Sequence, residues 1–323
     1  MITPDDVKFA YQLFLGRDPE NEDVINNFCQ NTHSLKQLRD VFLNSPEFMS
    51  QVKDLMGQSH PTRHRHPFHL PFIPVETQVS DETLQKMFNR IQAEWEYLGN
   101  KDPYWSVVTQ PKYHQDEFAI HSDEFYLSGH HATKLFLAAL MRCGINLNEI
   151  KTCIEIGCGV GRVTYHLSKE FEKVIAIDIS ESHLAIAKNY LEEKSVNNVE
   201  LIQWQSLDQL EMMPTVDAIH SLITFQHNPP PVMACMLRES LNSLRAGGVA
   251  FIQIPTYKSG YFFETSRYLN KLESQSMEMH FLPQREIFHI IDESNSICLE
   301  IREDAMVGDE SIMLSNTFVI RKN

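Results

Sequence analysis

The segment that most constrains the fold is a run of alternating glycines near the middle of the chain, TCIEIGCGVGR at residues 152–162. An apolar stretch ending in an acid leads into it, and a segment with helical character, Arg162 to Phe171, follows. Glycines at such a turn let the backbone reverse sharply and let a ligand approach without a Cβ in the way. A second apolar run ends at Asp178, about 20 residues after the first glycine, where nucleotide-binding βαβ units place an acid against ribose hydroxyls. The pattern therefore predicts a nucleotide-binding strand–turn–helix–strand unit.

The pattern E-x-G-x-G-x-G, in place of G-x-G-x-x-G, resembles class I S-adenosylmethionine-dependent methyltransferases. The resemblance implies S-adenosyl-L-methionine as cofactor. It also implies cofactor contacts at the turn and at the ends of the second and fourth strands, by Glu155, Gly157, Cys158, Gly159, Gly161, Asp178, Ile179 and Ser221. In that family an aspartate after the third strand accepts a hydrogen bond from the adenine amino group. Here Gln205 stands at that position, followed by Ser206, and its carbonyl can accept the same bond. Asp208 is the alternative.

Seven runs with strand character follow one another in the order of this family. They are residues 152–155, 174–178, 199–204, 216–223, 249–255, 297–302 and 317–321. Asp217 near the start of the fourth run and a Gly-Gly pair before the fifth add to the resemblance. We therefore expect an α/β fold, with a Rossmann-like seven-stranded methyltransferase sheet, a helical lid, and a small all-α N-terminal domain.

Changes in composition divide the chain into three parts. Residues 1–57 read as four short helices, and the pieces at 11–19 and 42–48 resemble a small bacterial helical module of unassigned function. That resemblance suggests a docking device for a protein partner. Residues 58–80 alternate prolines with the histidines His60, His64, His66 and His69. Prolines impose extended geometry and no cysteine or acid lies among these histidines, so we expect a linker and no metal site. Residues 81–323 form the methyltransferase domain, with the lid at 81–145 and an acceptor-site insertion at 257–295.

Two histidines are candidates for the catalytic base. His227 lies in the loop after the fourth strand, and the ordinary histidine pKa of about 6.5 suits proton abstraction near neutrality. The alternative is that His227 only supports the cofactor loop. His280, beside Glu278 in the insertion, is the rival. Tyr126, Tyr257 and Glu278 are candidate acceptor contacts, although a role of Tyr126 in packing the lid explains its position equally well.

The segments at 225–230 and 277–284 resemble a bacterial branch of the family found among polysaccharide and natural-product genes. This association favours O-methylation of a sugar, a glycan or another hydroxylated metabolite. N-methylation of a small molecule or peptide, and a non-catalytic binding protein that keeps the fold, are the alternatives. Nucleic acid is disfavoured because 28 basic against 43 acidic residues give a net charge of −15. In addition, Asn228-Pro229-Pro230 is followed by Pro231, so no aromatic residue is in place to stack a flipped base.

The remaining composition is that of a globular protein. No segment approaches the roughly 20 consecutive apolar residues of a membrane-spanning helix. The N-terminal residues lack the basic and apolar regions of a signal peptide. Six cysteines are scattered without a C-x-x-C spacing. We therefore expect free thiols in the reducing environment of the cytoplasm.

Overall fold

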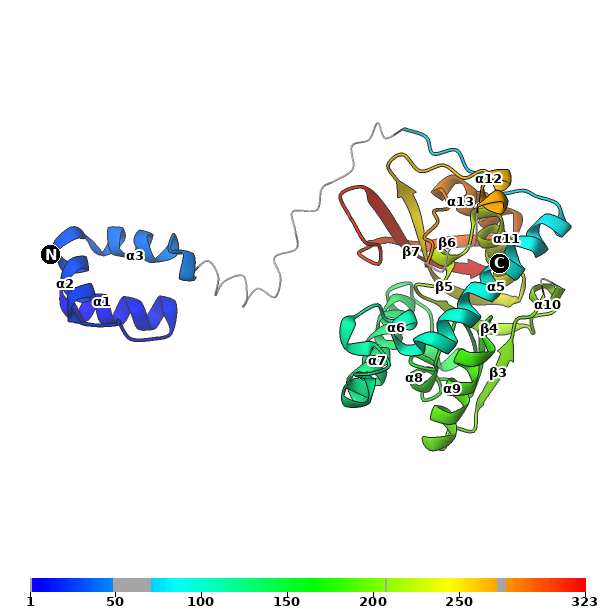
Figure 1. Cartoon of the computed structure of the whole chain (residues 1–323), viewed down its shortest axis with the longest axis horizontal. Coiled ribbons are helices and arrows are strands. Elements are labelled where there is room, and N and C mark those ends of the chain that lie inside the picture. Colours follow the sequence, from blue (N-terminus) through cyan, green and yellow to red (C-terminus); the bar gives the residue numbers. More distant parts are fainter. Residues whose placement is uncertain (1, 49–70, 207, 272–276) are drawn as a thin grey trace. The chain divides into compact units, whose positions relative to one another are not determined.

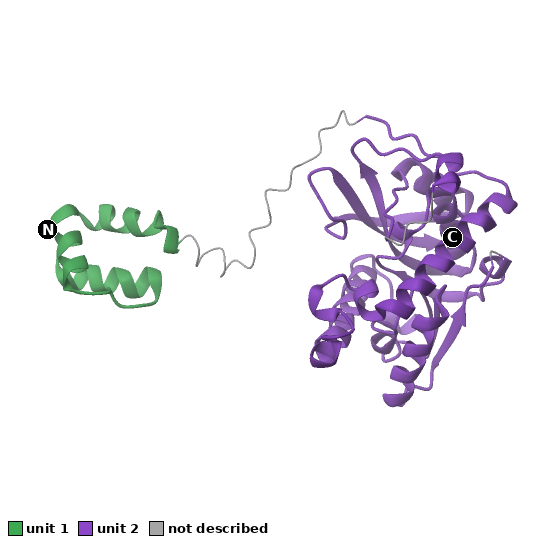
Figure 2. Ribbon diagram, viewed as in Figure 1, with its two compact units in different colours: residues 1–65 green, residues 66–323 purple. Residues whose placement is uncertain are grey.

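The computed structural model describes residues 2–48, 71–206, 208–271 and 277–323. The chain divides into two compact units, residues 1–65 and residues 66–323 (Figure 2). The four linker histidines and most of the predicted linker lie outside the described residues. The expectation that they bind no metal therefore stays a prediction.

The first unit is a small helical bundle. Helix α1 (Pro4–Ala10) begins with a capping box between Thr3 and Asp6. It continues as a π-helical turn, η1 (Tyr11–Leu15), which ends at the left-handed Gly16. Helices α2 (Glu22–Asn31) and α3 (Leu35–Leu43) follow, and residues 46–48 are again helical. The apolar core that they share is formed by Val7, Ala10, Tyr11, Leu15, Ile25, Leu38 and Phe42, with Ile2 beside them.

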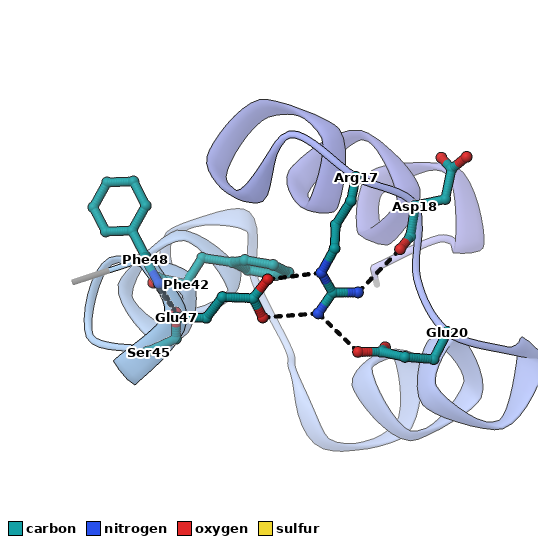
Figure 3. Close-up of polar contacts among 7 residues, drawn as sticks. All are labelled: Arg17, Asp18, Glu20, Phe42, Ser45, Glu47 and Phe48. Carbon is teal, nitrogen blue, oxygen red and sulfur yellow. Dashed lines mark hydrogen bonds and ion pairs between the residues drawn. The ribbon is translucent and has the colours of Figure 1, made fainter. Parts of the chain in front are cut away.

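Arg17 joins the end of the first helix to Glu47, near the last described residue of this unit. Arg17, just after the first helix, binds Glu47 through two parallel hydrogen bonds of 2.7 Å from Nε and Nη2 (Figure 3). Its Nη2 also donates to Glu20 at 2.7 Å, and Nη1 donates to the carbonyl of Asp18. Hydrogen bonds from Arg17 lower the pKa of both carboxyl groups. The planar guanidinium suits this forked geometry, which a lysine could not reproduce.

The second unit is built on one seven-stranded sheet of order β3-β2-β1-β4-β5-β7-β6 (Figure 1). Its strands are β1 (Thr152–Ile156), β2 (Lys173–Asp178), β3 (Val199–Gln203), β4 (Val216–Ser221), β5 (Leu244–Lys258), β6 (Ser296–Asp304) and β7 (Met313–Lys322). The first five run parallel, and β7 lies antiparallel between β5 and β6. The predicted α/β class and the seven-stranded sheet are confirmed.

Helices cover both faces of this sheet. They are α5 (Asp81–Lys101), α6 (Pro103–Val107), η2 (Pro111–Tyr113), α7 (Phe118–Arg142), η3 (Leu147–Glu149), α8 (Thr164–Leu167), α9 (Glu181–Glu193), α10 (Asp208–Glu211), η4 (Phe225–His227), α11 (Pro230–Asn242), α12 (Thr265–Asn270) and α13 (Gln284–Glu293). Alternate residues of β1 face opposite layers. Ile154 packs in the cluster that includes α5, α11 and α13, and Cys153 packs in the cluster that includes α7 and α8.

Helix α7 includes residues 121–130, and Phe125 and Tyr126 are buried on one side of it. One local prediction was wrong. The helix expected from Arg162 to Phe171 is regular only over the four residues of α8. Ser168 follows it, and its hydroxyl bonds the carbonyl of Tyr165, a local bond that competes with helix continuation.

The carboxylate of Asp217 anchors the N-terminal end of β1, at the opposite end of this strand from the glycine turn. Asp217 accepts hydrogen bonds of 2.8 Å from the backbone amides of Lys151 and Thr152, and its other oxygen pairs with Arg245. Partial burial opposes ionisation, but these hydrogen bonds outweigh it and lower the pKa of Asp217 to about 2. The aspartate near the start of the fourth strand therefore holds β1 and β4 in register.

Candidate active site

The glycine turn lies directly against the loop that follows β4. Gly157 has a φ of +77°, and a Cβ on it would lie 2.1 Å from the hydroxyl oxygen of Thr224. Gly161, with a φ of +81°, packs instead against helix α9, where a Cβ would lie 3.2 Å from the Cβ of Ala187. The first glycine therefore allows close approach at the mouth of the turn. The third allows the turn to pack closely on helix α9.

Asp178, the last residue of β2, is oriented by backbone amides. Its Oδ2 accepts a hydrogen bond of 2.7 Å from Gly159, and its Oδ1 accepts one of 3.0 Å from Ser180. The hydroxyl of Ser180 in turn caps α9. The carboxylate is thus held at the end of the sheet, beside the glycine turn.

These groups open into a cavity of about 620 Å³. Its walls come from the ends of β1, β2 and β4, from α5 and α7, from residues 106–110 and from residues 277–279. The volume lies in the range of about 300–1,000 Å³ that is usual for small-molecule sites. Its place beyond the carboxyl ends of parallel strands is where open α/β sheets bind ligands.

Most of the sequence-predicted cofactor residues lie together in this cavity. Its walls include Glu155, Gly157, Cys158, Gly159, Asp178 and Ile179. Ser221 is buried behind the wall and donates to the carbonyl of Ile156 at 3.0 Å. Gln205 is exposed, and its side-chain amide donates to Gln203 at 2.9 Å. Trp204, next to it, lines the cavity in its place, and Ser206 does not reach the wall either.

Three residues with ionisable side chains, Glu155, Arg162 and His220, lie together in the cavity wall. Glu155 accepts from Thr164 at 2.5 Å, and burial raises its pKa to about 8. Arg162 donates from Nη1 to Ser128 at 3.1 Å, while its buried Nε has no hydrogen-bond partner among the described residues. His220 is paired in register with Glu155, and burial lowers its pKa to about 3. Neither ring nitrogen of His220 has a partner within the described ranges. Arg162 and His220 are the residues that sequence reasoning missed, and only the place of Arg162 directly after the glycine turn pointed to it.

His227 also lines the cavity. Its Nδ1 lies 3.1 Å from the backbone carbonyl of Glu278, and its Nε2 lies 3.2 Å from the side-chain nitrogen of Gln226. Because a carbonyl only accepts, Nδ1 carries the proton and Nε2 carries the lone pair. Burial lowers the pKa of His227 to about 4, so the ring is neutral at neutral pH.

The other proposed catalytic and acceptor residues do not line this cavity. His280 bonds the hydroxyl of Tyr261 at 3.0 Å, and its Nε2 lies 3.4 Å from Glu278. Hydrogen bonds from His280 and from Lys271 lower the pKa of Glu278 to about 2. Glu278 therefore belongs to an ion-pair cluster, in which Arg90 also lies 3.5 Å away.

The two tyrosines lie elsewhere. Tyr257 is buried in an apolar cluster with Ile73 and Phe281. Tyr126 lines a second cavity of about 570 Å³ and stacks on Tyr190 with ring centroids 3.5 Å apart. Among residues 2–48, 71–206, 208–271 and 277–323, no group of three or more histidines, cysteines or acids is placed to hold a metal ion. Within the same ranges, none of the helices has both the length and the apolar character needed to cross a membrane.

The strand order, the antiparallel seventh strand and the glycine turn beside an acid define the class I methyltransferase fold. Residues 153–248 match the family described as "Methyltransferase domain". The chain therefore carries a match to a methyltransferase domain over these residues.

Similar proteins support this class. The chain is 40% identical over 75 residues to a malonyl-[acyl-carrier protein] O-methyltransferase of Bacillus anthracis, a match that covers 23% of this chain and 26% of that protein. It is 24% identical over 217 residues to a demethylmenaquinone methyltransferase of Lactococcus lactis subsp. lactis, covering 62% and 73% of the two chains. The chain thus spans about a quarter of the length of the first relative.

A solved structure shows the same fold. It is magnesium protoporphyrin IX methyltransferase from Synechocystis PCC 6803 with bound SAH. The TM-score is 0.52 and the sequence identity is 15%, and the match covers 73% of this chain and all of that one. At this level of identity, the likeness concerns the fold.

Proposed function

We propose that the protein transfers a methyl group from S-adenosylmethionine to a hydroxyl group of a small-molecule acceptor. The observation that carries this proposal is the continuity of one cavity, which joins the glycine turn and Asp178 to His227. A cofactor held at the first two would share this cavity with an acceptor near the third.

The residues around the turn fit the cofactor. Asp178 would accept hydrogen bonds from the ribose hydroxyls, and the glycine turn beside it, which Gly159 joins to Asp178, lines the cavity with backbone. The cavity walls formed by Ile179 and Trp204 suit the faces of an adenine ring. Arg162, whose buried Nε lacks a partner among the described residues, is a cation available for the amino-acid carboxylate. Gln205 would have to leave Gln203 to reach the adenine edge.

The chemistry is an in-line displacement. S-adenosylmethionine supplies a methyl group on a positively charged sulfur; the new bond joins that carbon to the acceptor oxygen, and sulfur keeps the electron pair of the broken bond. The acceptor's O–H proton has to leave, and its recipient would be Nε2 of His227, which would exchange the hydrogen bond from Gln226 for one from the acceptor hydroxyl. The protein's main contribution is alignment of the reactants and exclusion of water.

The sequence-based hypothesis of a sugar, a glycan or another hydroxylated metabolite defines the acceptors to be tested. The same proposal gives the N-terminal unit a docking role toward a protein partner. Phe9 and Leu13 of that unit are 64% and 63% exposed, which supplies an apolar surface for it. A place in polysaccharide biosynthesis and in the cytoplasm is part of the same hypothesis.

Isothermal titration calorimetry with S-adenosylhomocysteine tests the proposal on the full chain. We expect one binding site per chain, followed by transfer of label from [methyl-¹⁴C]S-adenosylmethionine to hydroxylated acceptors. Binding without transfer to hydroxyl or amine acceptors would instead indicate a binding protein that keeps the fold. No heat of binding would contradict the cofactor assignment.

A further inference from the structure

The order of the strands separates the cavity into two halves. The glycine turn and Asp178 follow β1 and β2, on one side of the sheet centre. The other walls come from the loop after β4, from residues 277–279 after β5, and from the loop between β6 and β7. On the β4 side the apolar lining residues are Leu222, Ile223, Met236, Met277, Met279 and Met306, and the polar ones, all uncharged, are His220, Thr224, Gln226, His227 and Asn228. We call this side the acceptor half.

Charge is confined to the opposite half. Among the described residues, the acids and the arginine in the cavity wall are Glu155 in β1, Asp178 at the end of β2, and Arg162 in the turn after β1. Among the described residues from β4 onward, none that lines the cavity is a lysine, arginine, aspartate or glutamate. An acceptor that carried a phosphate or carboxylate here would lose its hydration without gaining a counter-charge.

Ile223 differs from the rest of the acceptor half in its backbone conformation and in its exposure. Both are unfavourable for an isoleucine without a ligand. Its φ is +57°, in the left-handed region that is a genuine outlier for a β-branched residue. The other two non-glycine residues with positive φ in the described chain, Ser195 and Asn295, each lie just after a helix end, where such a conformation is common. Ile223 instead follows a strand, and its side chain is 41% exposed at the cavity. Backbone strain of this kind gathers at ligand sites.

A buried glutamine of β5 holds this conformation in place. The carbonyl oxygen of Gln253 accepts the backbone N–H of Ile223 at 2.9 Å. Its amide nitrogen donates to Ser315 at 2.7 Å and to Gln226 at 3.4 Å, and Gln226 reaches His227. The fully buried side chain of Gln253 therefore positions Ile223 directly, and His227 of the same loop through Gln226. We regard Gln253 as a positioning residue.

From these contacts we infer that the acceptor is a neutral molecule with an aromatic or similarly flat apolar body, which packs against Ile223 and the methionines with its hydroxyl toward His227. The inference rests on the proposed function and narrows it. Methionine side chains are flexible and polarizable, so they fit the faces and edges of aromatic rings of different shapes. A sugar, in contrast, needs many free hydrogen-bonding groups, and the side chains of Thr224, Gln226 and Asn228 in this half already hydrogen-bond within the protein.

Calorimetry on the full chain tests this inference with two neutral probes. The protein is first titrated with S-adenosylhomocysteine; the saturated complex is then titrated with 2-naphthol, a hydroxylated aromatic, and separately with methyl α-glucoside. The variant Ile223→Asn keeps a residue that tolerates positive φ but makes the wall polar. Ile223→Gly removes the side chain and the strain together. The control is Ile301→Asn on β6, because Ile301 is 39% exposed and does not line the cavity.

We expect 2-naphthol to bind the complex more tightly than the glucoside. Both Ile223 variants should weaken 2-naphthol binding at least tenfold and change S-adenosylhomocysteine affinity less than twofold, while Ile301→Asn changes neither. Tighter binding of the glucoside, no binding of 2-naphthol, or unchanged 2-naphthol affinity in both Ile223 variants would overturn the inference alone. Failure of S-adenosylhomocysteine to bind would overturn the proposed function, and this inference with it.

Discussion

The carboxylate of Asp178 accepts a 2.7 Å hydrogen bond from the backbone amide of Gly159, so the acid of the second strand and the glycine turn of the first form one rigid unit. Neither residue could move without disturbing the other. This contact joins two residues that are 19 positions apart in sequence and places both at the cavity wall.

The first prediction concerns this carboxylate. Asp178→Ala should lower the affinity for S-adenosylhomocysteine by about tenfold to a hundredfold, because hydrogen bonds to a charged group contribute roughly 1.5–3 kcal/mol. Calorimetry measures the change, with circular dichroism to establish folding. Asp208→Asn is the matched control, since Asp208 does not line the cavity. An equal loss of S-adenosylhomocysteine affinity in both variants would contradict the assignment of the ribose contact to Asp178.

The second prediction concerns His227. His227→Gln should lower kcat by roughly a hundredfold, a typical contribution of a general base, and leave cofactor affinity within about twofold. Because burial lowers the pKa of His227 to about 4, the lone pair is available above that pH, and the rate should fall only as the pH drops toward 4. Label transfer at a series of pH values tests both points.

The control for this variant is His289→Gln on the exposed surface of α13, where His289 pairs with Glu293. It should leave kcat unchanged. Normal turnover of His227→Gln would assign His227 to support of the cofactor loop.

The third prediction follows from the burial of Glu155. Burial raises its pKa to about 8, so between about pH 4.5 and pH 8 the unfolded chain loses this proton while the folded chain keeps it. The free energy of unfolding should therefore fall as the pH rises through this window, by about 1.4 kcal/mol for each pH unit that this group controls. Gln at this position cannot ionise. The melting temperature of Glu155→Gln should therefore fall less than that of the wild type between pH 5.5 and pH 8.5. Parallel curves for the two proteins would show that Glu155 ionises normally.

The fourth prediction concerns the first unit. Arg17→Lys keeps the charge but loses the forked pair of hydrogen bonds to Glu47, so it should loosen residues 2–48 nearly as much as Arg17→Ala. Hydrogen exchange of the full chain would show faster exchange in these residues and no change in residues 71–323. Lys36→Ala is the control, because Lys36 is exposed on α3. Full protection in Arg17→Lys would mean that charge alone holds the unit together.

The fifth prediction concerns strain. Ile223→Gly relieves a left-handed conformation that costs an ordinary residue about 1–2 kcal/mol, whereas glycine itself loses roughly 0.5–1 kcal/mol in conformational freedom. We therefore expect stability equal to the wild type or up to about 1 kcal/mol higher, in denaturant unfolding. A loss of more than about 2 kcal/mol would show that Ile223 serves packing of the core.

Local sequence patterns were enough to predict the sheet and the glycine turn. The seven strands and the glycine turn depend on apolar periodicity and backbone freedom within a few residues. The same holds for Asp178 and Gly157, whose positions in the cavity follow from the ends of parallel strands.

The rest of the site depends on contacts between distant parts of the chain. His220 reads as an ordinary strand residue, and only the packing of α7 over the sheet makes it a buried, unpaired wall of the cavity. The sequence made His280 a candidate base and Glu278 a candidate acceptor contact, but Lys271 and Arg90 pair with Glu278 in an ion-pair cluster outside the cavity. The clamp of Gln253 on Ile223 spans 30 residues, and no local pattern marks it.

The central claim is tested most directly by a crystal structure of the chain grown with S-adenosylhomocysteine. We predict electron density for the ligand in the 620 Å³ cavity, with the ribose hydroxyls within hydrogen-bond distance of Asp178 and the sulfur directed toward the half that contains Ile223 and His227. Ligand density at any other place on the chain, or a ribose that does not contact Asp178, would contradict the account.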